Sequence, residues 1–143
     1  MALTTYRAKW WLAGLWLAGF LGVLLVLVAQ SAMNYYEPRT ADAWTWFMTT
    51  LMPTVSLIVG VLVADFHAGR VAGPPAQVPV PPALFWLAAG LSGVYLLLVA
   101  ISILAQPFLS TTPPLELMQR SNLWLAPMQA LTLGALGAFF RNA

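Results

Sequence analysis

The sequence predicts an all-α membrane protein with four transmembrane helices, arranged as two helical hairpins in tandem. The composition is 61% hydrophobic and only 7% charged, whereas a soluble domain is about half apolar and a quarter charged. Four uncharged runs have the length, about 20 residues, that a helix needs to cross the hydrocarbon core of a bilayer. A stretch of the second run also recurs in the fourth, which indicates a duplicated hairpin.

The four uncharged runs are separated by segments that hold all of the charged residues. The runs extend over Trp10–Gln30, Trp44–Ala64, Phe85–Gln106 and Asn122–Phe140. Arg7 and Lys9 precede the first run, as they would in a secretory signal peptide. However, this run is longer than the roughly 7–15 residues of a signal core. We therefore expect it to remain as the first transmembrane helix.

The connections divide the chain into two hairpins and a linker. Residues 1–68 hold the first hairpin and residues 84–143 the second. Residues 69–83 between them are rich in proline and glycine, which favours an extended, semi-rigid segment. On the other side of the membrane, residues 110–114 are expected to break the chain and residues 115–119 to form a short surface turn.

The basic residues favour a cytoplasmic location for both chain ends. Four of the six lie on the side of the termini and two on the other, namely Arg7, Lys9, Arg70 and Arg141 against Arg39 and Arg120. Cytoplasmic loops are enriched in Lys and Arg, which predicts this orientation. The preference for arginine over lysine is typical of bacteria with GC-rich genomes, so we expect a bacterial inner membrane.

Aromatic residues flank the runs at the depth of the lipid headgroups. Amphipathic rings prefer this depth, so we expect most of these residues to be interfacial anchors. They include Trp10 with Trp11, Tyr35 with Tyr36, Trp44 with Trp46, Phe85 with Trp86, Trp124, and Phe139 with Phe140.

The duplication is carried by matches in all four runs. Residues 53–66, PTVSLIVGVLVADF, return at residues 127–140 as PMQALTLGALGAFF. Residues 11–13 and 86–88 share the sequence WLA, and residues 29–30 and 105–106 share AQ at nearly the same separation. Because each unit holds two spans, both units enter the membrane from the same side. This predicts a pseudo-two-fold axis along the membrane normal.

Small residues spaced four apart form candidate helix-packing faces. Helices in lipid associate where small side chains let their backbones approach closely. We expect these faces to pack the bundle internally, to join copies of the chain, or to do both. They are Gly14, Ala18 and Gly22; Ser56, Gly60 and Ala64; Ala89 and Gly93; and Ala130, Gly134 and Ala138.

Two prolines at matching positions, Pro53 and Pro127, are expected to kink the second and fourth helices. Each removes one backbone hydrogen bond, which bends a helix. Thr49 and Thr50 precede the first proline, and their hydroxyls are candidates to satisfy the freed carbonyls.

Few residues are suited to catalysis or to holding a metal. The chain has no cysteine and a single histidine, His67, which lies near Asp65 and Arg70. Two such ligands do not make a zinc site, so we expect a solvated polar cluster. The four runs contain no ionisable group, which argues against proton-coupled transport. We expect no cofactor, no metal, no nucleic-acid partner and no enzymatic activity.

The polar residues within the runs are uncharged. The candidates for lining a path are Thr49, Ser56, Gln129 and Thr132. Gln129 lies near the middle of the fourth run, and its repeat counterpart is Val55. A buried amide needs partners, so Gln129 either forms hydrogen bonds between helices or faces an aqueous path in an oligomer.

These observations favour two classes of function. In the first, copies of a non-enzymatic membrane protein associate into a pore, a channel or a membrane-perturbing assembly. The cluster of Asp65, His67 and Arg70 then lies at the inner mouth of the path. In the alternative, the chain is an accessory subunit that docks on other membrane subunits. An enzyme that relies on Asp65 and His67 is a less favoured third hypothesis.

Overall fold

The protein is all-helical in the residues that the computed structural model describes, which are 5–72, 81–108 and 113–142. The helices are α1 (Thr5–Ala32), α2 (Thr40–Ala72), α3 (Pro82–Leu104) and α4 (Pro114–Asn142), with a 3₁₀ turn, η1 (Gln106–Phe108), after α3. Each of these four α-helices is long and apolar enough to cross a bilayer. The prediction of an all-α membrane protein with four candidate spans is therefore confirmed.

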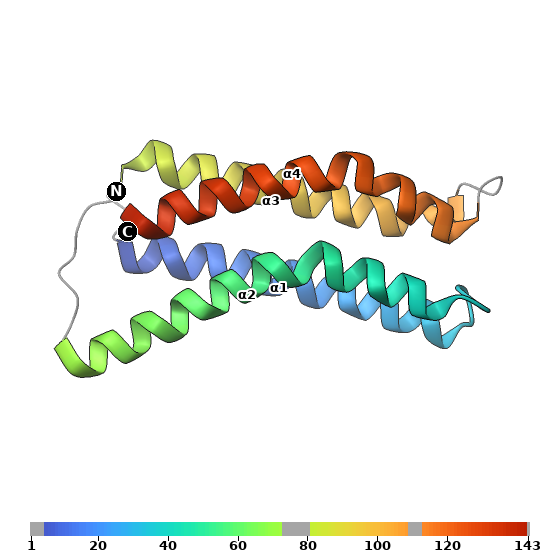
Figure 1. The fold of residues 1–143 in the computed structure, drawn as a ribbon, viewed down its shortest axis with the longest axis horizontal. Coiled ribbons are helices and arrows are strands. Elements are labelled where there is room, and N and C mark those ends of the chain that lie inside the picture. The colour runs from blue at the N-terminus through green and yellow to red at the C-terminus, as the bar shows by residue number, and fades with distance from the viewer. Residues whose placement is uncertain (1–4, 73–80, 109–112, 143) are drawn as a thin grey trace.

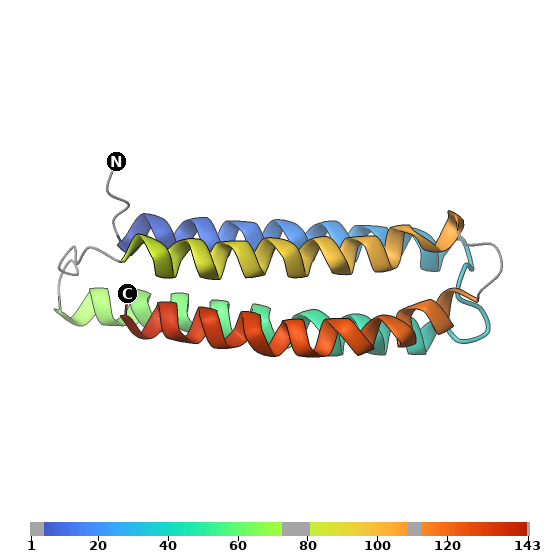
Figure 2. The same cartoon turned by 90° about the horizontal axis from the view of Figure 1, so that it is seen from above.

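The helices form two layers of two (Figure 2). One layer holds α1 and α3, and the other holds α2 and α4. The main contacts join α1 to α2, α2 to α4, α4 to α3 and α3 to α1, and the α3–α4 contact is the most extensive. Both chain ends lie at the same end of the bundle (Figure 1), which we call the terminal end.

Helix α2 runs beyond the predicted span and enters the segment predicted as linker. It continues through Ala72, while residues 73–80 lie outside the described part. Helix α3 then begins at Pro82. Proline suits the first helical turn because that turn lacks partners for its N–H groups in any case.

The predicted surface turn at residues 115–119 is wrong, because these residues belong to the first turns of α4. A proline, Pro114, again opens the helix, and Glu116 lies in its first turn. Acidic residues are favoured there by the helix dipole. Glu116 also accepts a bond from Arg120, one turn on, at 2.6 Å.

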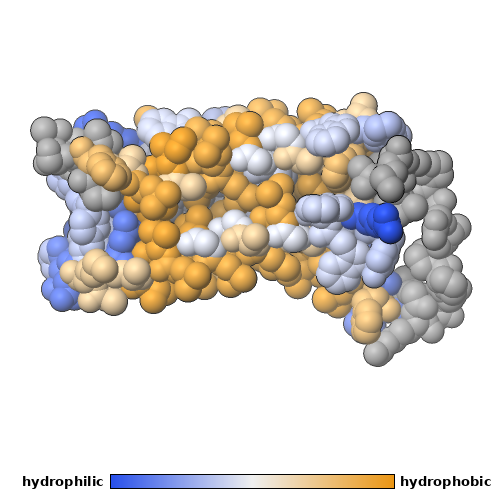
Figure 3. All heavy atoms as spheres, turned by 180° about the vertical axis from the view of Figure 1, so that it is seen from behind, coloured by the Kyte–Doolittle hydropathy of each residue, from blue (hydrophilic) through white to orange (hydrophobic). Residues whose placement is uncertain are grey.

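The outer surface of the bundle is largely apolar, as a bilayer requires. Large side chains exposed along the helices include Leu21, Leu25, Leu97, Ile101 and Leu131. Figure 3 shows one face of the molecule, on which hydrophobic residues cover the centre and hydrophilic residues gather toward the ends.

Several aromatic residues predicted as interfacial anchors are instead part of the core. Trp10, Trp11 and Trp86 are exposed, as the prediction requires. Tyr36, Trp46 and Phe139 are buried. The Trp46 indole N–H donates to the Ser121 hydroxyl on α4 at 3.2 Å. A ring near a helix end can turn toward a neighbouring helix as readily as toward lipid, and the sequence does not show which.

Among the described glycines, Gly19 has the tightest surroundings, at the point where α1 meets a side chain of α3. A Cβ atom at this position would lie 2.8 Å from both δ-methyl carbons of Leu96. Gly19 therefore lets the Leu96 side chain seat against the backbone of α1. This glycine was not among the predicted helix-packing residues.

Replacing Gly19 with isoleucine should destabilise the bundle by about 1–3 kcal/mol, because the added side chain overpacks the contact with Leu96. The measurement is unfolding in mixed micelles as the fraction of denaturing detergent rises. Gly90→Ile is the matched control, since a Cβ at Gly90 meets no atom within 4 Å. Equal losses in both variants would contradict the packing role of Gly19.

Candidate functional site

The predicted small-residue faces on α1, α2 and α4 point largely away from the chain's own bundle, whereas the face on α3 is half-buried. Gly14, Ala18 and Gly22 are exposed on α1, and Ser56, Gly60 and Ala64 are exposed on α2. On α4, Ala130 and Gly134 are exposed and Ala138 is half-buried, as are Ala89 and Gly93 on α3. A Cβ added at Gly14, Gly22, Gly60, Gly93 or Gly134 would meet nothing within 4 Å. At these glycines, the expected packing between helices of one chain is therefore not found.

Both prolines lie inside continuous helices, Pro53 in α2 and Pro127 in α4. Helix α2 changes direction near its middle, and its second half runs away from α4 (Figure 1). A proline cannot donate to the carbonyl four residues earlier, which is that of Thr49 for Pro53.

Two other helices supply donors to the carbonyls near Pro53. The Gln129 amide on α4 donates to the carbonyl oxygens of Thr50 at 3.0 Å and Thr49 at 3.4 Å. The Tyr95 hydroxyl on α3 donates to the Thr50 carbonyl at 2.7 Å. Gln129 thus forms the interhelical hydrogen bonds that were one of its two predicted roles. These bonds join α2, α3 and α4 beside the proline.

The hydroxyls of Thr49 and Thr50 were expected to satisfy these carbonyls. The Thr49 hydroxyl does not do so in the structure. Its hydroxyl lies 3.0 Å from the carbonyls of Thr45 and Trp46, one turn earlier in α2. A short hydroxyl side chain reaches the preceding turn of its own helix. The freed carbonyl at the proline is therefore left to a long side chain from a neighbouring helix.

The two halves of the chain differ at this point. By the predicted repeat, Pro127 corresponds to Pro53 and Val55 to Gln129. Among the described residues, no side chain donates to the carbonyl of Leu123, which lies four residues before Pro127. The polar support is thus built around one proline of the pair.

The four candidate path-lining residues do not lie together within one chain. Thr49 and Ser56 are on the exposed side of α2, and Gln129 is half-buried at the α2–α4 contact. Thr132 is fully buried, and its hydroxyl donates to the Met128 carbonyl at 2.8 Å. Any common path would have to form between copies, and this part of the hypothesis stays a prediction.

The polar cluster at the terminal end of α2 is divided in the structure. Asp65 accepts a bond from Lys9 on α1 at 2.7 Å, and only 12% of the Lys9 side chain is exposed. The Nδ1 atom of His67 lies 2.8 Å from the carbonyl of Val63 in its own helix. Arg70 lies in α2, but its side chain is outside the described part. Among the described residues, no group of three or more His, Cys, Asp or Glu is placed to hold a metal.

At the other end of the bundle, which we call the loop end, Tyr36 joins two glutamines that the predicted repeat pairs. Its hydroxyl donates to the Gln30 side-chain carbonyl and lies 3.1 Å from that of Gln106. The Gln106 amide donates to the Ser102 carbonyl at 3.2 Å. Burial raises the pKa of Tyr36 well above its ordinary value, and Tyr35 adds to the rise. The hydroxyl therefore stays protonated and can donate.

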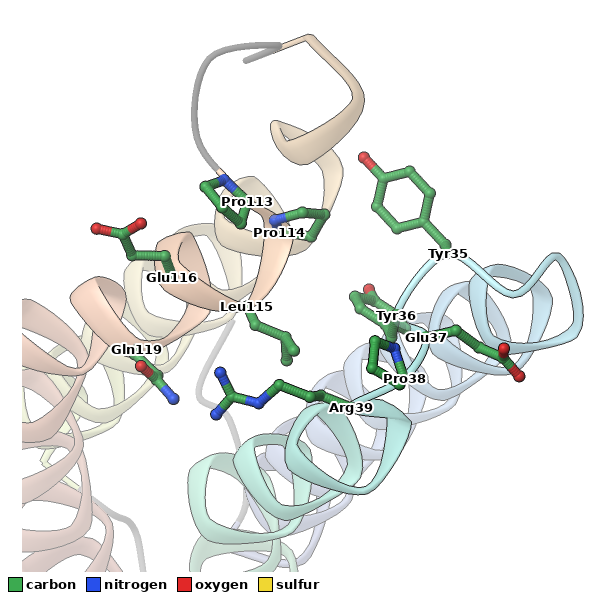
Figure 4. A pocket seen from close by; sticks show the side chains of 10 residues that line it. All are labelled: Tyr35, Tyr36, Glu37, Pro38, Arg39, Pro113, Pro114, Leu115, Glu116 and Gln119. Carbon is green, nitrogen blue, oxygen red and sulfur yellow. The ribbon is translucent and has the colours of Figure 1, made fainter.

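A cavity of about 440 Å³ lies between the two connections at the loop end (Figure 4). It is lined by residues 35–39 of the first hairpin and by residues 113–116 and 119 of the second. Its charged groups are largely engaged, because Arg39 pairs with Asp42 and Glu116 with Arg120, each at 2.6 Å. Most of the cavity wall is formed by prolines, tyrosines and Leu115, which offer few groups for catalysis or for binding a charged ligand.

Comparison of the chain with known protein families, with curated proteins and with solved structures gave no match. Fold and function therefore rest on the sequence and the geometry of this chain. The contacts that sequence reasoning missed are Lys9 with Asp65, Tyr95 with Thr50, and Tyr36 with the two glutamines. Except for Tyr36 with Gln30, which are six residues apart, each joins residues that are distant in sequence, so no local pattern signals it.

Replacing Gln129 with leucine should cost about 1 kcal/mol of stability, because the carbonyls near Pro53 lose a donor. The measurement is again unfolding in mixed micelles. In a Pro53→Ala background the same change should cost less, since alanine in place of this proline restores a backbone N–H for the Thr49 carbonyl. An equal cost in both backgrounds would show that Gln129 does not serve the proline.

Proposed function

We propose that this protein is a non-enzymatic integral membrane protein that associates with copies of itself through its outward small-residue faces. In an assembly, the copies form a pore, a channel or a membrane-perturbing structure. The observation that carries the proposal is the open space at the glycines of these faces, where an added Cβ would meet no neighbouring helix within 4 Å.

The outward position matters because lipid gives no hydrophobic reason for helices to associate. Association in a bilayer relies on close backbone contact, which glycine, alanine and serine allow. The stripe on α2 contains Ser56, Gly60 and Ala64, and the stripe on α4 contains Ala130 and Gly134. The outer sides of α2 and α4 thus allow a partner helix to approach their backbones closely.

The hydroxyl residues of α2 supply the polar wall of the proposed path. Thr49 and Ser56 lie on the exposed side of this helix, and Ser56 is also a member of its small-residue stripe. Gln129 is near, with its amide directed at the α2 backbone. The wall would be polar but uncharged, so we expect weak ion selectivity.

The orientation and origin proposed from the sequence complete this model. We place both termini in the cytoplasm of a bacterium, with the protein in its inner membrane, on the basis of the basic residues. The predicted pseudo-two-fold axis along the membrane normal is not found, because it would place α1 opposite α3 and α2 opposite α4 across the bundle, whereas these parallel pairs are direct neighbours. The polar groups Asp65, His67 and Arg70 would then lie at the cytoplasmic mouth.

The alternative is an accessory subunit of a larger membrane complex. The same exposed faces can accept helices of other proteins, because small residues do not select a partner by charge. The composition of the purified particle separates the two functions. Copies of this chain alone support self-association, whereas one copy bound to foreign subunits supports the accessory role.

Native mass spectrometry in mild detergent should show a particle of several copies for the wild-type chain. Gly60→Leu and Gly134→Leu should each shift it toward the monomer, because a large side chain keeps the backbones apart. Gly90→Leu, at an exposed glycine outside the predicted faces, is the control and should leave the mass unchanged. A wild-type monomer without other subunits would contradict both functions.

Liposomes that contain the wild-type protein should release a trapped small ion, and Ser56→Leu should lower the rate several-fold by narrowing the path. Met52→Leu, on the same exposed side of α2, is the matched control. An unchanged rate in Ser56→Leu, with the oligomer intact, would remove Ser56 from the path.

A further inference from the structure

Four polar or indole-bearing side chains, one from each helix, lie buried at one level of the bundle. They are Trp16 on α1, Thr54 on α2, Ser92 on α3 and Thr132 on α4. Each has a relative exposure of 0%. We call this set the central layer, because each residue lies well inside its candidate membrane span.

The contacts among α1, α3 and α4 place three members of the layer at the same level. The Thr132 hydroxyl lies 3.5 Å from the carbonyl of Leu91, the residue before Ser92. The Trp16 ring packs against the ring of Tyr95, with centroids 5.8 Å apart. Tyr95 lies one turn from Ser92 on α3. Trp16 and Thr132 therefore contact α3 at nearly the same height.

Contacts of α2 place the fourth member there too. Thr54 lies one turn from Thr50, whose carbonyl accepts the bond from Tyr95. Helix α1 also meets α2 on both sides of this level, through Phe20 with Phe47 and through Lys9 with Asp65. Trp16 and Thr54 lie between these two contacts on their own helices.

Three members of the layer have a polar atom that is buried and without a partner among the described residues. These atoms are Trp16 Nε1, Thr54 Oγ1 and Ser92 Oγ, and the only other such side-chain atom is Ser31 Oγ. Other hydroxyls in the spans, such as those of Thr45, Thr49 and Ser102, bond to carbonyls of their own helices. For Thr54, the carbonyl one turn earlier is that of Thr50, which already accepts bonds from Tyr95 and Gln129.

The neighbouring level toward the terminal end is different. It holds Leu12, Ile58, Ala88 and Leu136, which are apolar and fully buried or nearly so. The central layer instead has three small hydroxyl side chains and one indole, all fully buried. Three of its four side chains are small and polar, whereas all four side chains of the next level are hydrocarbon.

We infer that the central layer binds ordered water, which bridges the indole N–H of Trp16 and the hydroxyls of Thr54 and Ser92. A buried polar group without a partner is costly, and most severely so where no bulk water is near. Buried water typically makes about three hydrogen bonds to otherwise unpaired groups, which is the number of unpaired atoms here.

The chemistry of the layer favours water over an ion. Trp16 can only donate, whereas serine and threonine hydroxyls both donate and accept. A cation would lack a carboxylate, since no acidic residue lies within the layer. An anion such as chloride would find three donors, but its charge would be buried without a counter-charge, which costs far more than burying a neutral molecule.

The direct test is solid-state NMR of the full chain in lipid bilayers, with magnetisation transferred from water protons to the indole ¹⁵N groups. The Trp16 signal, assigned by its loss in Trp16→Phe or by its correlations within the residue, should receive magnetisation from water despite its burial. The Ile58 methyl groups, in the apolar level, should receive it several-fold more slowly. A Trp16 signal as slow as that of Ile58 would overturn the inference.

A second measurement tests the bridge between helices. The hydroxyls of Thr54 on α2 and Ser92 on α3 form no direct hydrogen bond with each other, so a bridging water would couple Thr54→Val to Ser92→Ala. If water bridges the two hydroxyls, the unfolding equilibrium constant of the double variant should differ by about threefold or more from the value expected if the two single effects were independent. The pair Thr54→Val with Ser102→Ala, whose hydroxyl bonds within α3, is the control and should show independent effects.

Independent effects in both pairs, with each Thr54 and Ser92 variant at least as stable as the wild type, would indicate a dry layer and overturn the inference. Repeating the NMR measurement with and without chloride separates water from an anion. A transfer to Trp16 that is unchanged by chloride supports water, and one that disappears when chloride is added would assign the layer to an anion.

Discussion

The hydrogen bonds at Pro53 are the interactions on which the interior of the bundle depends. Inside a bilayer, a backbone carbonyl that loses its helical donor has no bulk water to replace it. Gln129 of α4 donates to the freed Thr49 carbonyl and to that of Thr50, and Tyr95 of α3 also donates to the Thr50 carbonyl, so the bonds beside Pro53 join three helices. The Thr50 carbonyl that accepts these bonds lies one turn before Thr54, whose hydroxyl has no partner among the described residues. The carbonyls beside Pro53 thus lie where three helices meet and next to the central layer.

Further polar contacts fix the two ends of the bundle. At the loop end, Tyr36 contacts Gln30 of α1 and Gln106 of η1. At the terminal end, Lys9 and Asp65 join α1 to α2. An ion pair near the membrane boundary is partly solvated and contributes little by itself. Its value lies in fixing the relative height of the two helices, which the apolar surface between them does not specify.

Glycine has two separate uses in this chain. At Gly19 the absent side chain is needed within the bundle, because Leu96 occupies the space. At Gly60 and Gly134 the space beside the backbone is open, so these residues add nothing to the packing of one chain. The sequence pattern of small residues four apart marks the second kind and misses the first. A spacing of four between small residues shows that one side of a helix lacks large side chains, but it does not show which helix that side contacts.

The sequence by itself determined the helical class, the number of candidate spans and their approximate position, because crossing hydrocarbon imposes a minimum length of uncharged helix. Only the tertiary structure decided which polar groups meet. Gln129 was recognisable as a residue that needs a partner, but its partner is a carbonyl 79 residues away. The inward position of Trp46 and the outward position of the glycine faces likewise depend on the rotation of each helix about its axis, and the inward position of Tyr36 depends on the turn between α1 and α2. That rotation follows from contacts between helices, since helices that are apolar on all sides carry almost no amphipathic signal to orient them.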